Sequence, residues 1–342
     1  MEYIAAVYQG NSKIDITSKQ LPKVNDNDVL IKVQAATICG TDVHILHGDY
    51  DSEPPVVLGH EYSGIVVAKG EGVSSINIGD LVTVEPHKYC GVCKYCRIGK
   101  EHLCLEKKAF GVHLDGGFAQ YNIVPDKIVY KVPSGLTPTE AALTENIGCC
   151  LHGIDQAGIN LGDDVVIIGG GFVGIVLAEL SRLRGAGQVI VIEPNENRQS
   201  IIKARGFEVL NPFTSDITNK ILEMTNNLGA DVVIEAAGRK ETAQQCFELV
   251  GRGGTILFFG VVPPNNQISI TPNDIYKREL KIVGSAINPF SHHRSLQIMK
   301  SLHLRDLVTH QFPLEDIEKA IGVAASGEGI KVVIHPNGDV NE

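Results

Sequence analysis

Short runs of β-branched residues alternate with helical stretches in the second half of the chain. Residues 165–168 predict a strand, and the helix expected after it has an apolar face. That face consists of Val173, Val176, Leu177, Leu180 and Leu183. Further strands are predicted at residues 188–193, 230–236 and 255–259, with helical segments between them. This alternation is typical of a doubly wound parallel sheet in an α/β protein.

The first 145 residues or so follow a different pattern, in which short alternating runs are separated by Gly, Pro and Asp. Strands are predicted at residues 29–33, 64–68, 81–85 and 118–124. They indicate a mostly antiparallel β unit. We expect the first domain to span 1–150 and the parallel sheet 151–288, with the boundary in the glycine-bearing stretch 151–162. The tail 289–342 has no periodicity that places it.

Length and composition describe a folded protein of about two domains. The chain has 342 residues, of which 43% are hydrophobic and 20% charged. Its 30 basic and 40 acidic residues give a net charge of −10, which disfavours nucleic acid and anionic membranes as partners. We find no signal peptide and no apolar run near the roughly 20 residues of a membrane span. We therefore expect a cytoplasmic protein whose eight cysteines are reduced and serve metal or reaction chemistry.

A glycine motif stands directly after the strand predicted at 165–168. The residues that form it are Gly169, Gly171, Phe172, Val173 and Gly174. Glycine is needed because the chain turns sharply, its backbone approaches a pyrophosphate, and the helix N-terminus supplies N–H groups. Glu193 ends the next strand, where it can bind both ribose hydroxyls and repel a 2′-phosphate, which favours NAD over NADP. Arg198 could cover the adenine, hold a 2′-phosphate or lie on the helix surface, and we prefer the adenine role.

Four cysteines, Cys90, Cys93, Cys96 and Cys104, are spaced C-x2-C-x2-C-x7-C. Four thiolates on one tight loop satisfy a tetrahedral zinc fully and leave no open position for a substrate. Such a closed site is structural, so its loss should weaken the fold rather than remove the chemistry directly. An iron–sulfur cluster and a redox dithiol pair are the alternatives.

A second set of candidate ligands lies upstream and consists of Cys39, His60 and Glu61. A thiolate, an imidazole and a carboxylate all suit zinc, and with three ligands the fourth position stays open for water or an alcohol oxygen. Taken singly, Cys39 and His60 are more typical of buried packing residues. Their co-occurrence with a dinucleotide motif favours a catalytic site.

Together these motifs resemble the zinc-dependent medium-chain dehydrogenases over essentially the whole chain. The resemblance implies a GroES-like catalytic domain, a Rossmann domain, and a tail that rejoins the first domain. It implies that Cys39 and His60 bind the catalytic zinc, that Glu61 is a ligand that comes and goes, and that Asp42 orients His60. It further implies two zinc ions per subunit, one catalytic and one structural, with NAD as cofactor and a homotetramer or homodimer as assembly.

Glu145 connects the chain to one branch of that family. It stands where the classical alcohol dehydrogenases have a second cysteine and the sorbitol dehydrogenase branch has a glutamate, so the chain resembles the polyol branch. By this resemblance Glu145 binds zinc either directly or through water. Cys149 and Cys150, like Cys246, are expected to be packing residues.

The resemblance also implies a mechanism. Zinc acts as a Lewis acid that lowers the pKa of the alcohol, and hydride passes to the nicotinamide. Thr41 accepts the proton and passes it along the ribose hydroxyls to His44, whose unperturbed pKa of about 6.5 suits release to solvent. The alternative is that Thr41 caps a turn and His44 is an exposed loop residue. Backbone contacts to the nicotinamide end are implied for Phe259, Gly260, Val261, Ala286, Ile287 and Asn288.

The chain departs from sorbitol dehydrogenases in the substrate pocket. They usually have an Arg-Tyr pair about where Ile287 and Asn288 stand, so a shorter diol, a pentitol or a plain secondary alcohol becomes the expected substrate. His292, His293 and Arg294 could hold a polyol phosphate, although such a cluster is more often a solvated helix start. L-threonine 3-dehydrogenase is a further enzymatic alternative, and a non-catalytic dinucleotide-binding relative is the alternative from another class.

Overall fold

The computed structural model describes residues 2–338, which form two compact units. One unit comprises the chain up to Gly148 and from Pro289 onward, and the other comprises Cys149–Asn288. None of the helices in residues 2–338 has the length and apolarity needed to span a bilayer.

The division between the units falls inside helix α4 (Thr144–Ala157), between Gly148 and Cys149. Gly153 does not interrupt this helix. It makes room for the ring of Phe259, which would lie 2.7 Å from a Cβ at position 153. This glycine therefore serves packing and not a linker.

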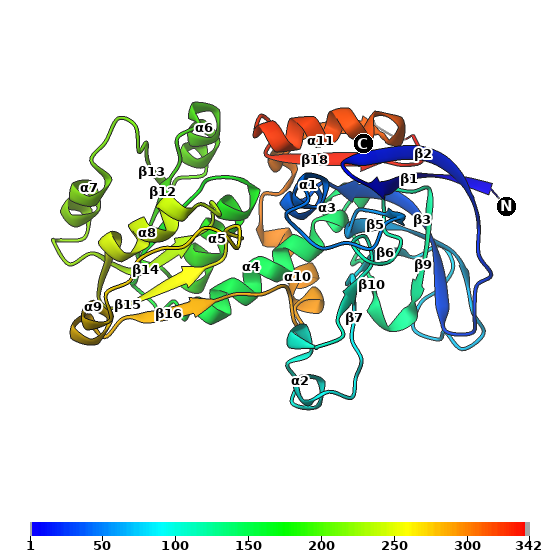
Figure 1. Ribbon diagram of the computed structural model, residues 1–342, viewed down its shortest axis with the longest axis horizontal. Helices are drawn as coiled ribbons and strands as arrows, with labels where there is room; N and C mark the ends of the chain where they lie inside the picture. The colour runs from blue at the N-terminus through cyan, green and yellow to red at the C-terminus, as the bar shows by residue number, and fades with distance from the viewer. Residues whose placement is uncertain (1, 339–342) are drawn as a thin grey trace. The chain divides into compact units, whose positions relative to one another are not determined.

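The first unit is built mainly from antiparallel strands (Figure 1). A three-stranded sheet has the order β2 (Lys13–Gln20), β1 (Glu2–Gly10), β4 (Val56–Val57). A seven-stranded sheet has the order β10 (Val129–Lys131), β6 (Leu81–Val84), β5 (Glu61–Lys69), β3 (Asp28–Thr37), β18 (Lys331–His335), β17 (Val308–Pro313), with β9 (Tyr121–Pro125) also on β3. Because β18 pairs with β3, the tail contributes a strand to this unit.

The strand expected at 118–124 is shorter, since β9 begins at Tyr121. The backbone of Phe118 is bonded elsewhere: its N–H donates to the carbonyl of Leu58 at 3.0 Å, and its carbonyl accepts from the N–H of Ala6 at 2.9 Å. Phe118 is fully buried. Phe118 is therefore tied to β1 and the β4 end, and the chain joins β3 only from Gln120, whose carbonyl accepts from the Val33 N–H at 3.0 Å.

The helices of the first unit are α1 (Gly40–His47), α2 (Lys94–Arg97), α3 (Pro138–Ala142), α10 (His292–Ile298) and α11 (Ile317–Ser326). Helix α11 packs on β17 and β18. Helix α2 lies in the cyan loop that projects from this unit in Figure 1. The pair β7 (His87–Lys88) and β8 (Lys108–Ala109) closes the base of that loop.

The second unit contains a parallel sheet. Its order is β13 (Glu208–Leu210), β12 (Gln188–Ile192), β11 (Asp164–Ile168), β14 (Ala230–Glu235), β15 (Val250–Phe258), β16 (Lys281–Gly284). The helices are α5 (Phe172–Arg184), α6 (Glu196–Ala204), α7 (Ile217–Met224), α8 (Lys240–Leu249) and α9 (Pro272–Arg278). The strands in the middle of the sheet are runs of Val and Ile because both of their faces are buried.

One residue of the predicted apolar helix face was placed wrongly. Leu183 is 52% exposed, whereas Val176, Leu177 and Leu180 are buried. Leu183 lies in the last turn of α5, which ends at Gly185 in the left-handed conformation, so the helix stops before that position can pack on the sheet.

Candidate functional site

Cys39, His60 and Glu61 come together because strands β3 and β5 are paired. Thr37 is opposite Glu61 in the antiparallel register, so the end of β3 faces the start of β5. Cys39 follows β3 as the N-cap of α1, and His60 precedes β5. One donor atom from each of the three lies within 4.8 Å of the others. A thiol, an imidazole and a carboxylate that converge this closely form a donor set that fits zinc.

Asp42 on α1 is fully buried and braces this set. Its Oδ2 accepts a hydrogen bond from the Cys39 backbone N–H at 2.9 Å, and its Oδ1 lies 3.7 Å from His60 Nδ1. Asp42 Oδ1 and His60 Nδ1 both lack a hydrogen-bond partner among the described residues. The other ring nitrogen of His60 lies 3.7 Å from Glu61 Oε1. A small closure would let Nδ1–H bond to Asp42, the contact that orients a metal-binding histidine.

Three residues that sequence analysis did not identify hold the Glu61 carboxylate. Lys331 donates to Oε2 at 2.6 Å, Asn146 donates to Oε1 at 2.5 Å, and the Thr37 hydroxyl donates to Oε2. Lys331 and Glu61 are 4% and 0% exposed, so they form a buried ion pair. For Lys331, the sequence offered one signal: it is an isolated lysine at the start of the apolar strand β18.

Burial and neighbouring charges shift the pKa values of the donor set. Burial and the Glu61 carboxylate raise the pKa of the Cys39 thiol. Burial alone would raise the pKa of Glu61, but Lys331 and His60 outweigh it and hold that pKa below its usual value. A divalent cation would convert Cys39 to the thiolate, which is the form that binds zinc.

Glu145 is linked to the donor set through Asn146 but is not one of the three residues that form it. It is 5% exposed in the first turn of α4, and its Oε2 accepts a 3.4 Å hydrogen bond from Asn146, whose amide also binds Glu61. The group that closes to within 4.8 Å consists of Cys39, His60 and Glu61. Glu145 therefore stays a predicted ligand.

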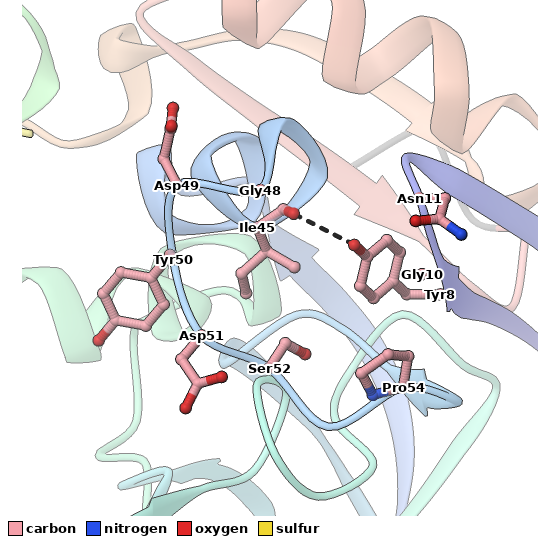
Figure 2. Close-up of a pocket in the computed structure, with 10 residues that line it drawn as sticks. All are labelled: Tyr8, Gly10, Asn11, Ile45, Gly48, Asp49, Tyr50, Asp51, Ser52 and Pro54. Atoms are coloured by element: carbon pink, nitrogen blue, oxygen red, sulfur yellow. Dashed lines mark hydrogen bonds between the residues drawn. The ribbon is translucent and has the colours of Figure 1, made fainter.

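Thr41 and His44 both lie on α1. The Thr41 hydroxyl oxygen is 3.7 Å from Cys39 Sγ, and His44 is half-buried with its Nδ1 3.8 Å from Asp49 Oδ2. Asp49 lines an open cavity of about 510 Å³. Figure 2 shows this cavity with Asp49 on the loop after α1 and with the Tyr8 hydroxyl donating to the carbonyl of Ile45 at 3.2 Å. His44 therefore lies next to Asp49, a residue that lines a solvent-open cavity.

The four cysteines of the projecting loop form a second cluster, with all four Sγ atoms within 4.8 Å of one another. Cys96 Sγ lies 3.6 Å from Cys93 Sγ and 3.9 Å from Cys90 Sγ. A tetrahedron with Zn–S bonds of about 2.3 Å has edges of roughly 3.8 Å, whereas a disulfide needs about 2.05 Å. Backbone N–H groups of Cys96 and Leu105 lower the pKa of Cys93 to about 6, which favours its thiolate. The cluster, completed by Cys104, fits zinc.

The glycine motif joins β11 to α5 at the carboxyl edge of the parallel sheet. Gly169 has a φ of +109°, and a Cβ at Gly174 would lie 1.8 Å from the Gly169 carbonyl oxygen, so neither position tolerates a side chain. Gly171 caps the N-terminus of α5, where Phe172 is buried and Val173 half-buried. A cavity of about 940 Å³ opens along this edge, lined by both Gly169 and Gly171.

Glu193 and Arg198 also line the 940 Å³ cavity. Glu193 follows β12, and its two carboxylate oxygens accept hydrogen bonds from the backbone N–H of Gly170 at 2.7 Å and of Asn195 at 2.8 Å. The Arg198 guanidinium lies 3.8 Å from the position that a Cβ on Gly171 would take. An acid and a guanidinium therefore flank the same end of the cavity.

The predicted nicotinamide contacts differ in exposure. The N–H groups of Phe259 and Gly260 donate to the Glu235 carbonyl at 3.0 and 2.8 Å, and Val261 is 62% exposed. Ala286 is exposed and Ile287 half-buried at a φ of +50°. Asn288 is fully buried.

The cluster of His292, His293 and Arg294 starts helix α10, as expected, but only two of its members are solvated. His292 is fully buried, and its Nε2 bonds to the Val84 carbonyl at 3.1 Å. Burial lowers the pKa of His292 to about 3, so this ring is neutral and offers no charge to a phosphate. His293 and Arg294 are exposed.

The remaining cysteines belong to neither donor set. Cys150 and Cys246 are fully buried and Cys149 is half-buried. Burial and the nearby Glu235 raise the pKa of Cys246. A buried, protonated thiol of this kind is a packing residue.

Family models match most of the chain. The alcohol dehydrogenase GroES-like domain matches residues 25–134, and the zinc-binding dehydrogenase model matches residues 173–301. A sorbitol dehydrogenase of Halalkalibacterium halodurans is 33% identical over 98% of this chain and 99% of its own. An L-threonine 3-dehydrogenase of Caldanaerobacter subterraneus is 33% identical over 94% of this chain and 95% of its own. A zinc-binding dehydrogenase structure from Sinorhizobium meliloti, bound to NADP, has a TM-score of 0.95 and 36% identity, covering 98% of this chain and all of that one.

Proposed function

The chain belongs to the zinc-dependent medium-chain alcohol dehydrogenase family and is an oxidoreductase, and from this premise we propose that it oxidises a secondary alcohol of a polyol or diol with NAD, giving a ketone. The observation that carries the proposal is the convergence of Cys39, His60 and Glu61 to within 4.8 Å. A non-catalytic relative of the fold would have no need for this donor set.

Two zinc ions are proposed per subunit. Cys39, His60 and Glu61 would hold the first, with Asp42 orienting His60 and Glu145 near by. When bound, this zinc supplies a Lewis acid that lowers the pKa of an alcohol hydroxyl, while the dinucleotide accepts the hydride. The four-cysteine cluster would hold the second, and its closed donor set gives it a structural role.

The proton relay is proposed to run from Thr41 to His44. The Thr41 hydroxyl lies 3.7 Å from Cys39 Sγ, where it can accept the proton of an alcohol held at the donor set. His44 stands one helical turn further along α1, and its Nδ1 is 3.8 Å from the carboxylate of Asp49, which lines the open cavity of Figure 2. An imidazole next to a carboxylate and solvent is suited to release that proton.

Replacement of Thr41 by valine should lower kcat by about 100-fold, because valine has a similar shape but cannot accept the proton. Thr41→Ser should stay close to wild type. Zinc content measured by metal analysis should be unchanged in both variants, since Thr41 is not a ligand. Wild-type turnover in Thr41→Val would remove this residue from the relay.

The choice of NAD over NADP is proposed from Glu193. Its carboxylate would oppose a 2′-phosphate, although Arg198 lies on the same cavity and the Sinorhizobium meliloti relative was solved with NADP. Glu193→Gln keeps a carbonyl acceptor for the Gly170 N–H and removes the charge. We expect the ratio of kcat/KM for NAD to that for NADP to fall roughly tenfold or more. An unchanged ratio would show that this acid does not select the cofactor.

The substrate is proposed to be an uncharged polyol or diol. The buried, neutral His292 counts against a phosphate ester, because it leaves that cluster without one of its expected cations. L-threonine stays the second candidate, since threonine dehydrogenases match this chain as well as the sorbitol dehydrogenase does, at 33 to 34% identity.

The experiment that tests the function follows NADH formation at 340 nm with NAD and NADP. The panel contains polyols, 2,3-diols, polyol phosphates and L-threonine, each before and after chelation of zinc. Chelator-sensitive turnover of polyols or diols is the expected result. Turnover of threonine alone would move the chain to the second candidate, and silence with zinc bound would overturn the proposal.

A further inference from the structure

Glu235 occupies a central place at the carboxyl edge of the parallel sheet. It is the last residue of β14 and pairs with Ile168 of β11 on one side and Phe258 of β15 on the other. Its carbonyl accepts the N–H groups of Phe259 and Gly260. The residue is completely buried. Its backbone thus anchors the segment that follows β15.

The two carboxylate oxygens of Glu235 have different surroundings. Oε1 accepts three hydrogen bonds, from the backbone N–H groups of Ala237 and Gly238, both at 2.9 Å, and from the Thr242 hydroxyl at 2.7 Å. Oε2 is buried and has no hydrogen-bond partner among the described residues. It lies against Gly260, where it would be 2.5 Å from an added Cβ. One oxygen therefore fixes a turn, and the other is a buried acceptor that no described residue satisfies.

Three segments close around this carboxylate. A Cβ on Gly169 would lie 3.0 Å from the Ala237 nitrogen, so the glycine motif packs on the turn after β14. A Cβ on Gly238 would lie 2.9 Å from the Val261 carbonyl oxygen, so the same turn packs on the segment after β15. These close approaches leave little freedom for either turn. The position of Glu235 is thereby set by the backbone on both sides.

The sheet order places Glu235 along a bound dinucleotide. Strand β11 carries the glycine motif, β12 with Glu193 lies on one side of it, and β14 with Glu235 lies on the other. A dinucleotide with its pyrophosphate at the glycine motif and its adenosine ribose at Glu193 must extend its nicotinamide half over β14 and β15. The oxygens of Glu193 are both bonded to backbone N–H groups. The unpaired carboxylate oxygen is thus on the nicotinamide side.

We propose that Glu235 is a positioning residue for the cofactor, and that its unpaired carboxylate oxygen supplies a fixed negative charge that favours the oxidised dinucleotide over the reduced one. The inference rests on the proposed dinucleotide function and is independent of the alcohol. The nicotinamide ring is cationic when oxidised and neutral when reduced, so a fixed anion stabilises the two forms unequally. Arg239 and Lys240 follow on the same turn and line the same cavity as the glycine motif, but both are kept in every variant below and so contribute equally to each comparison.

The test compares the binding of NAD and NADH to wild type and to Glu235→Gln. The amide keeps a carbonyl acceptor for the bonds made by Oε1 and removes the charge. A unit charge about 10 Å away at an effective dielectric of about 20 changes a binding constant by roughly tenfold. We therefore expect the ratio of the NAD Kd to the NADH Kd to rise about 3- to 10-fold. Titration of NADH fluorescence, with NAD as competitor, gives both constants without turnover.

Two variants separate charge from structure. Thr242→Val removes one bond to Oε1 but keeps the charge, so it should weaken both cofactor forms by the same factor. Glu208→Gln, on the exposed strand β13, is the matched control and should change neither constant. Melting temperatures establish that each variant is folded. Glu235→Asp keeps the charge and should retain the wild-type ratio, and the uncharged Glu235→Met, which has a similar length, replaces Glu235→Gln if the latter does not fold.

The outcomes are distinct. A changed NAD to NADH ratio in Glu235→Gln, absent from both Thr242→Val and Glu235→Asp, supports the proposal. Equal effects on both forms would overturn it and leave Glu235 with a structural role alone. If the wild type prefers NADP, the same comparison is made with NADP and NADPH. A wild type that binds neither pair would overturn the proposed function itself.

Discussion

Replacement of Cys39 by serine should lower kcat/KM by roughly a thousandfold while the protein stays folded. Cys39 would contribute the only thiolate of the catalytic donor set, and its partners His60 and Glu61 alone bind zinc weakly. Loss of Lewis acid assistance is worth several kcal/mol, and at about 1.4 kcal/mol per tenfold a thousandfold effect corresponds to about 4 kcal/mol. We would measure zinc content per subunit, and turnover of whichever alcohol the substrate panel identifies.

The matched control for this variant is Cys149→Ser, since Cys149 is half-buried and belongs to neither donor set. It should keep wild-type activity and both zinc ions. Cys39→Ser should retain about one zinc, held by the four-cysteine cluster, and a melting temperature near that of wild type. Full activity in Cys39→Ser would contradict the assignment of the catalytic site.

The fold class was predictable because the sequence signals were local. The family models confirm the expected GroES-like and Rossmann combination. The strands with β-branched runs, such as β11 and β14, are buried on both faces and therefore stand out. The edge strands β13 and β16 were not predicted, because they are short and half-exposed and carry no comparable run. Leu183 was misplaced for a related reason, since periodicity does not show where a helix ends.

The sequence motifs predicted the donor residues of the candidate site but not the contacts that hold them. Cys39 and His60 are 21 residues apart, and the pairing of β3 with β5 brings them together without any signal in the spacing itself. The ion pair between Glu61 and Lys331 joins residues separated by 270 positions. An isolated lysine in the apolar strand β18 indicates a buried partner, but no local pattern identifies Glu61 as that partner. Such contacts follow from the sheet order and are visible only in the folded chain.

Replacement of Cys96 by serine should lower the melting temperature by at least about 10 °C and remove the second zinc. Cys96 is one of two buried members of the cluster, and its Sγ lies within 3.9 Å of two other sulfur atoms. The projecting loop has little core of its own, since Val92 is 65% exposed and Leu105 is 77% exposed. Zinc binding therefore supplies the ordering energy, which reaches about 10 kcal/mol in small structural sites, and each kcal/mol shifts a domain of this size by roughly 2–4 °C.

Cys96→Ser should lower stability and keep activity, whereas Cys39→Ser should lower activity and keep stability. Below its lowered melting temperature, Cys96→Ser should keep the catalytic zinc and a kcat within a few-fold of wild type, because the cluster offers no open position to a substrate. Calorimetry on the zinc-loaded protein, together with metal analysis of the folded fraction, separates the two cases. A Cys96→Ser protein that melts like wild type with two zinc ions would show that the cluster does not depend on this thiolate. An inactive protein of unchanged stability would instead place the four cysteines in the chemistry.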